Sequence, residues 1–132
     1  MKIIPTFVHG VTDYLAGFLL LLLPSLLGFA DEGGAAVWVP RVIGLALLVQ
    51  ALATNYELGA TRLLQMRMHL RNDDVAGVLL AASPWIFGFA GAGTNAWMPH
   101  VVLGVMIFVM SVMTERHPRV ADEPVRLSAT RS

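Results

Sequence analysis

The sequence predicts an all-α membrane protein with four transmembrane helices, built as two tandem parallel-repeat helical hairpins. Two observations carry this prediction: four long apolar runs separated by short charged segments, and an internal repeat at an offset of 60 residues. The chain has 132 residues, of which 56% are hydrophobic and only 14% charged, with a mean hydropathy of +0.67. Soluble domains use just under half apolar residues, and this length suffices for one domain.

Each apolar run is close to the roughly 20 residues that a helix needs to cross about 30 Å of hydrocarbon. The third run is the shortest, and we expect it to use Asn72 to Asp74 at one membrane interface. Two charged residues, Asp13 and Arg41, fall inside the runs. The predicted spans are residues 11–30, 38–56, 75–90 and 97–114.

Basic residues predict the orientation of these spans. In a chain with four spans, eight basic residues fall on one side, and the other side carries Arg41 alone. Because cytoplasmic loops are enriched in Lys and Arg, we expect both termini to be cytoplasmic in a multi-pass protein of the cell (inner) membrane. The eight residues are Lys2, Arg62, Arg67, Arg71, Arg116, Arg119, Arg126 and Arg131.

The repeated unit reads His-x3-Asp-x2-Ala-Gly-x6-Pro-x3-Gly-Phe-Ala and occurs from His9 to Ala30 and from His69 to Ala90. Trp-x-Pro follows in both copies, at Trp38 and at Trp97. Two spans per unit make the copies parallel, related by an axis along the membrane normal, unlike the inverted repeats of many transporters. The start of the chain imitates a secretory signal peptide, but the same Gly-Phe-Ala recurs in the third span, so we expect the first span to be retained.

The second copy contains Ser83-Pro84-Trp85, and here the chain resembles the SPW-repeat family of small bacterial membrane proteins. The first copy has Leu23-Pro24-Ser25 instead, so proline is the shared element. The resemblance covers most of residues 9–115 and implies fold and membrane location without an activity. The predicted organisation is a transmembrane domain (1–115) with repeats 9–57 and 69–115, a cytoplasmic interfacial loop or helix (58–72) and a disordered cytoplasmic tail (116–132).

On a helix the repeated positions share one face, so we expect them to mediate packing. Small residues allow close backbone approach, and the alanine-glycine pairs that end in Gly17 and Gly77 are predicted to join the two hairpins. Each proline frees a carbonyl four residues earlier, which Ser25 and Ser83 are near enough to satisfy. We therefore expect a kink followed by helix termination. The packing and kink residues are Gly17, Pro24, Gly28, Gly77, Pro84 and Gly88.

Four residues are predicted to anchor the outer membrane interface. Trp38 and Trp97 suit the headgroup level, where indole is enriched. Arg41 and His100 follow the two Trp-x-Pro motifs at matching positions, and we interpret both as headgroup anchors. An outward-facing site for an anionic ligand is the alternative.

Chemistry is concentrated at the cytoplasmic ends of the spans. The pair His9 and Asp13 recurs as His69 and Asp73, and the two-fold axis could bring these residues together with Glu57 and Glu115. Three interpretations are open. The aspartates could cap the span N-termini, they could hydrogen-bond to the histidines, or the four residues could bind a divalent metal, for which imidazole and carboxylate are suitable ligands.

Other function classes find no support in the sequence. The absence of cysteine excludes disulfides and thiolate metal sites, and zero net charge gives no reason to expect nucleic acid as a partner. Hydrolase, P-loop and dinucleotide motifs are missing, so we expect neither catalysis nor a cofactor. The predicted function is a non-enzymatic scaffold or accessory subunit of a membrane complex, whose partners are the lipid bilayer and further subunits or copies of itself. A metal- or ligand-binding protein and a small oligomeric transporter or channel are the alternatives.

Overall fold

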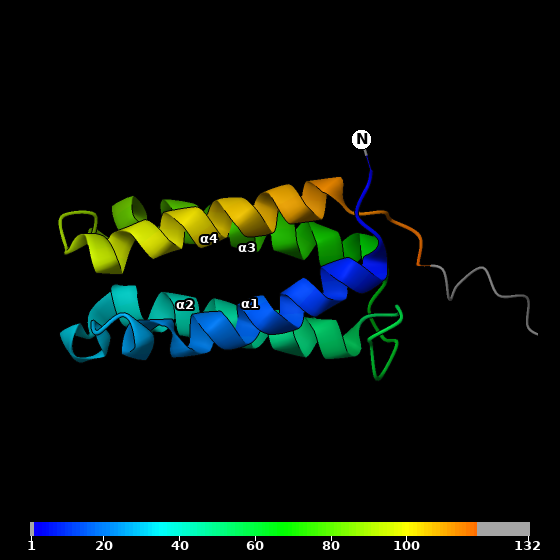
Figure 1. The fold of residues 1–132 in the computed structure, drawn as a ribbon, viewed down its shortest axis with the longest axis horizontal. Coiled ribbons are helices and arrows are strands. Elements are labelled where there is room, and N and C mark those ends of the chain that lie inside the picture. The colour runs from blue at the N-terminus through cyan, green and yellow to red at the C-terminus, as the bar shows by residue number, and fades with distance from the viewer. Residues whose placement is uncertain (1, 119–132) are drawn as a thin grey trace, which may run out of the picture.

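The computed structural model describes residues 2–118, and this part of the chain forms four long helices without strands (Figure 1). The predicted all-α class is therefore confirmed. Three of the helices, α1, α2 and α4, are long and apolar enough to cross a membrane. The third helix, α3, is as long as α1 but begins with charged residues and becomes apolar from Val75 onward. The elements are α1 (Thr6–Leu26), a short 3₁₀ turn η1 (Ala30–Glu32), α2 (Gly34–Ala53), α3 (Met66–Ile86) and α4 (Thr94–Met113).

Each helix begins before the apolar run that predicted it, by as much as nine residues for α3. The polar residues of these first turns are compatible with a helix because backbone hydrogen bonds, rather than hydropathy, set its length. The segment predicted as an interfacial unit, 58–72, is consequently divided between a loop up to Gln65 and the start of α3. Most of the predicted disordered tail lies outside the described residues.

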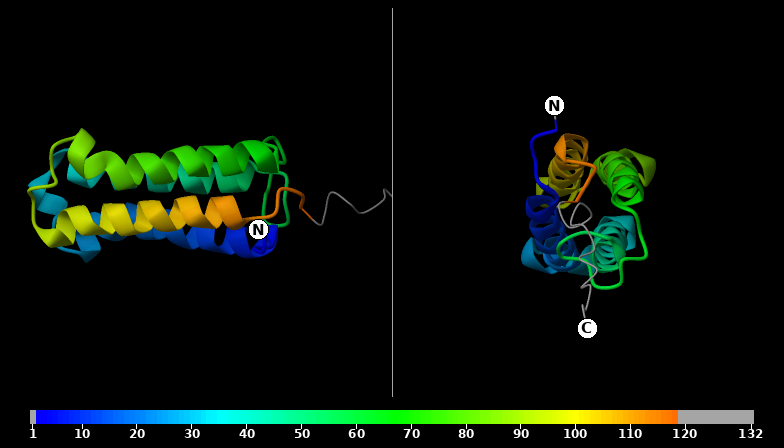
Figure 2. Two further views of the ribbon diagram at one scale, coloured as in Figure 1. Left: turned by 90° about the horizontal axis from the view of Figure 1, so that it is seen from above. Right: turned by 90° about the vertical axis from the view of Figure 1, so that its right-hand side faces the viewer.

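The bundle is built from two hairpins, α1 with α2 and α3 with α4, and helices pack more extensively within a hairpin than between hairpins (Figure 2). Glycine makes this close packing possible. A Cβ atom built on Gly17 would lie 3.0 Å from the carbonyl oxygen of Gly44, and one built on Gly77 would lie 2.7 Å from that of Gly104. Our prediction that the repeated glycines join the two hairpins is therefore wrong, because they join the helices inside each hairpin.

The repeated Pro-x3-Gly segment ends the first helix of each hairpin, as predicted. Gly28 and Gly88 both adopt φ of 76°, a conformation that glycine tolerates at a helix C-terminus. In the first copy the amide of Phe29 donates to the carbonyl of Pro24 at 2.9 Å, which closes the last turn. In the second copy Ser83 donates to the Leu80 carbonyl that the proline leaves free, at 2.7 Å.

The start of α1, the end of α4 and the loop between the hairpins lie at one end of the bundle (Figure 1). Two equivalent backbone contacts close this end. The Leu64 amide donates to Ala53 at 2.8 Å, beside the end of α2, and the Ile4 amide donates to Met113 at 3.1 Å, beside the end of α4. Because Ile4 and Leu64 are 60 residues apart, the repeat extends into these contacts. The first residues of the chain thus join the last turn of the second hairpin and complete a pseudo-two-fold ring.

Candidate functional site

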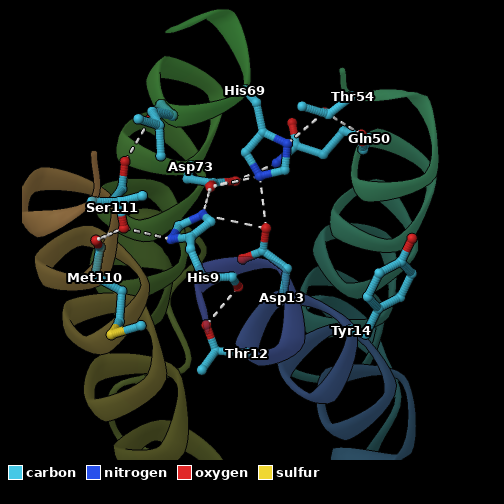
Figure 3. Close-up of polar contacts among 12 residues, drawn as sticks. His9, Thr12, Asp13, Tyr14, Gln50, Thr54, His69, Asp73, Met110 and Ser111 are labelled. Carbon is cyan, nitrogen blue, oxygen red and sulfur yellow. Dashed lines mark hydrogen bonds and ion pairs between the residues drawn. The ribbon is translucent and has the colours of Figure 1, made fainter. Parts of the chain in front are cut away.

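The repeated His-x3-Asp motifs meet inside the bundle, near the starts of α1 and α3 (Figure 3). His9 and Asp13 come from α1, and His69 and Asp73 come from α3. We call these four residues the His/Asp cluster. Their side chains are buried, with residue exposures of 1%, 6%, 0% and 0% in chain order. The cluster lies one to two turns inside the helix starts, about 5 to 10 Å along each axis at 1.5 Å per residue.

Each histidine binds the aspartate of the other repeat more closely than its own. His9 Nε2 lies 2.9 Å from Asp73 Oδ2 and 3.3 Å from Asp13 Oδ2. His69 Nε2 lies 2.6 Å from Asp13 Oδ2 and 3.1 Å from Asp73 Oδ2. The four atoms therefore form a ring that alternates nitrogen and oxygen, and this ring ties the two hairpins together.

Two threonines fix the orientation of the imidazole rings. Thr54, just after α2, donates its hydroxyl hydrogen to the Gln50 carbonyl at 2.6 Å and lies 2.6 Å from His69 Nδ1. Thr114, just after α4, donates to the Met110 carbonyl at 2.6 Å and lies 2.9 Å from His9 Nδ1. A hydroxyl has one hydrogen, so in each pair the imidazole Nδ1–H must be the donor and the threonine oxygen the acceptor.

This assignment leaves both Nε2 atoms facing ionised carboxylates, which can only accept hydrogen bonds. Four acceptor atoms at 2.6 to 3.3 Å repel one another unless positive charge lies among them. Two imidazole protons, one on each Nε2, or one divalent cation would both supply that charge. Burial makes the requirement stringent, because an uncompensated carboxylate inside a protein costs several kcal/mol, about 3 to 5 when a pair is broken.

The two halves of the cluster differ at one repeat position. The Gln50 side-chain amide donates to Asp73 Oδ1, whereas the equivalent residue on α4 is Met110, which has no hydrogen to donate. Asp13 borders instead on a cavity of about 240 Å³ between α1 and α4, with mostly apolar walls. The carboxylate of Asp73 is thus covered by Gln50, whereas the carboxylate of Asp13 borders on the cavity.

Helix capping by the aspartates, one of the three interpretations, is wrong. The N-cap positions of α1 and α3 are Pro5 and Gln65, and neither makes a side-chain cap hydrogen bond. The aspartates lie two turns further on because the helices start earlier than their apolar runs. Glu57 does not join the cluster, and its carboxylate accepts the hydroxyl of Thr6 at 2.7 Å. The predicted His–Asp hydrogen bonds are present, and metal binding stays a prediction.

His100 is not a headgroup anchor, because its side chain is 0% exposed and packs between Phe29 and Phe89. Its Nδ1 donates to the Ala96 carbonyl at 2.7 Å. Helices α2 and α4 correspond at an offset of 60 residues, whereas the Trp-x-Pro motifs match at an offset of 59. In the helices, His100 therefore corresponds to the buried Pro40 and not to the exposed Arg41. Trp38 is 48% exposed, and Arg41 and Trp97 are also accessible, near the starts of α2 and α4.

Three residues beside the cluster were not predicted from the sequence. Thr54 and Thr114 obey the offset of 60, so a longer repeat comparison could have found them. Tyr56 breaks the repeat and left no such signal. Its ring lies 6.0 Å from that of His69, and its hydroxyl is buried without a hydrogen-bond partner among the described residues. Burial raises the pKa of Tyr56, so this hydroxyl stays neutral and covers the cluster without adding charge.

Comparison with known proteins identifies the family of this chain. A family model described as SPW repeat domain matches residues 7–114, which includes both repeats and both threonines. No curated protein and no solved structure matches the chain. Because the match covers most of the chain, this protein belongs to the SPW repeat family.

Proposed function

We propose that this protein is a non-enzymatic membrane protein that binds one divalent transition-metal ion in the His/Asp cluster. One observation carries the proposal: each imidazole donates through Nδ1 to a threonine, so both Nε2 atoms, when they carry no proton, converge with both carboxylates as possible ligands in a buried site. Such a site fits a cation. Imidazole and carboxylate ligands together suit Zn²⁺ and its first-row neighbours.

The spacing of the ligand atoms supports this proposal. One ligand atom from each residue can be chosen so that all four lie within 4.8 Å of one another. A tetrahedral Zn²⁺ site with bonds of about 2.1 Å has ligand atoms roughly 3.4 Å apart. The observed nitrogen–oxygen distances, 2.6 to 3.3 Å, need to lengthen by less than an ångström.

The surroundings also have the character of a metal site. Histidine ligands usually donate their second ring nitrogen to an oxygen, which fixes the tautomer and orients the ring. Thr54 and Thr114 accept this bond for His69 and His9. The charge distribution predicts that both termini lie on the cytoplasmic side of the inner membrane. The metal would then lie near the cytoplasmic end of the bundle. The scaffold or accessory role and the oligomeric transporter or channel stay predictions from the sequence.

Calorimetric titration tests the proposal. The full chain is purified in mild detergent, stripped with a chelator and titrated with Zn²⁺. We expect one ion per chain for the unmodified protein and no stoichiometric binding for His69→Gln. His117→Gln is the matched control, because His117 is exposed and lies outside the cluster. Circular dichroism checks that each variant is folded, and Asp13→Asn serves as a second cluster variant. Unchanged binding in the folded cluster variants, or no binding to the unmodified protein, would refute the proposal.

A further inference from the structure

A second cavity, with several charged residues in its lining and separate from the His/Asp cluster, lies at the end of the bundle where α3 begins and α4 ends. It encloses about 380 Å³ between the first residues of the chain, the start of α3 and the end of α4. Four basic side chains line it, against one acidic side chain, Asp74. The basic residues are Lys2, Arg67, Arg71 and Arg116.

Within residues 2–118, these basic groups have no carboxylate partner. Among residues 2–118, no carboxylate lies within ion-pair distance of the three arginines, and the ion pairs found belong to the His/Asp cluster. Lys2 donates to the Val112 carbonyl at 2.8 Å, which is a neutral acceptor. Positive charge contributed by three separate segments around one cavity favours an anion, since guanidinium groups are well suited to phosphate.

Asp74 adds a second requirement. Its Oδ1 atom is buried and has no hydrogen-bond partner among the described residues. Buried carboxylate oxygens are normally satisfied, so this unpartnered oxygen is available to accept a hydrogen bond from a ligand. The cavity therefore fits a ligand that combines an anionic group for the arginines with a hydrogen-bond donor for Asp74.

The position of the cavity identifies the source of such a ligand. Two apolar residues of its lining, Met68 and Val112, are 46% exposed and face outward from α3 and α4. The remainder of α3, from Val75, is apolar. A polar cavity next to exposed apolar helix faces is where the headgroup of a membrane lipid would lie.

We propose that this cavity binds the headgroup of an anionic phospholipid, with the phosphate on the arginines and a headgroup hydroxyl donating to Asp74. Phosphatidylglycerol has both groups. The inference is independent of metal binding, because none of the four cluster residues lines the cavity.

Native mass spectrometry of the detergent-solubilised full chain tests this proposal. Phosphatidylglycerol is compared with phosphatidylmethanol, which carries the same phosphate charge without headgroup hydroxyls. We expect the unmodified protein to retain phosphatidylglycerol more strongly. The double variant Arg67→Gln/Arg71→Gln should weaken its binding by roughly tenfold or more, since each interfacial basic residue contributes about 1 kcal/mol. Both arginines are exposed, so these substitutions leave the packed interior intact.

Two further variants sharpen the test. Arg62→Gln removes an exposed basic residue from the loop at the same end of the bundle, outside the cavity lining, and should leave lipid retention unchanged. Asp74→Ala should abolish the preference for phosphatidylglycerol over phosphatidylmethanol. Equal loss of lipid in the Arg62 variant and in the double variant would overturn the proposal. So would equal retention of the two lipids by the unmodified protein.

Discussion

Removing one carboxylate from the His/Asp cluster should strongly destabilise the bundle. Asp73 is 0% exposed, and its Oδ2 lies 2.9 Å from His9 Nε2 and 3.1 Å from His69 Nε2. Asp73→Asn preserves the shape of the side chain but deletes the negative charge and turns an amide group toward the imidazoles. Breaking a buried pair by removing one partner costs about 3 to 5 kcal/mol. The unfolding equilibrium constant should therefore rise roughly 100- to 4,000-fold.

Equilibrium unfolding in mixed micelles, followed by circular dichroism in the presence of a chelator, measures this change. Asp31→Asn is the matched control, because Asp31 is exposed in η1 at the opposite end of the bundle. We expect the control to change the free energy of unfolding by less than about 0.5 kcal/mol. If Asp73→Asn costs no more than this control, the cluster does not hold the two hairpins together.

Three further predictions concern single positions. Gly104→Ala should cost about 1 to 3 kcal/mol in thermal unfolding, because its Cβ would lie 2.6 Å from a carbonyl oxygen of α3, whereas Gly91→Ala meets nothing within 4 Å and should be neutral. Gln50→Met copies the other repeat and should cost roughly 1 to 3 kcal/mol, because Asp73 Oδ1 loses its donor; an unchanged unfolding free energy would contradict the role of this amide. Thr54→Val should weaken Zn²⁺ binding by about 10- to 100-fold in calorimetry, if the proposed metal site is correct, because His69 Nδ1 loses its acceptor.

The sequence predicted the parts of this protein that depend on hydropathy and on repetition. Four apolar runs identified the helices, and the offset of 60 identified the two hairpins as equivalent units. The histidines and aspartates were identified because both copies of the repeat contain them at the same positions. Helix starts were placed too late, since hydropathy reports which residues contact lipid and not which residues form backbone hydrogen bonds.

Pairing between the repeats could be decided only in three dimensions. Gly17 contacts the second helix of its own hairpin, while His9 contacts the aspartate of the other hairpin, yet both belong to one repeated face. His100 shows the same limit: its motif suggested the exposed position of Arg41, but the helix offset places it in the interior. A periodic pattern states which residues share a face and does not state which neighbour that face contacts.

Hydropathy and repetition were therefore enough to predict the class of the protein, its repeat and the four residues with ionisable side chains at its centre. Only the folded structure shows that these four residues form one buried ring, because the ring joins helices that lie 60 residues apart in the chain. It also decided the state of the imidazoles, since only the positions of Thr54 and Thr114 fix which ring nitrogen donates. The open side of Asp13 follows from Met110 standing where Gln50 stands in the other repeat, a difference that has meaning only once both residues lie beside a carboxylate.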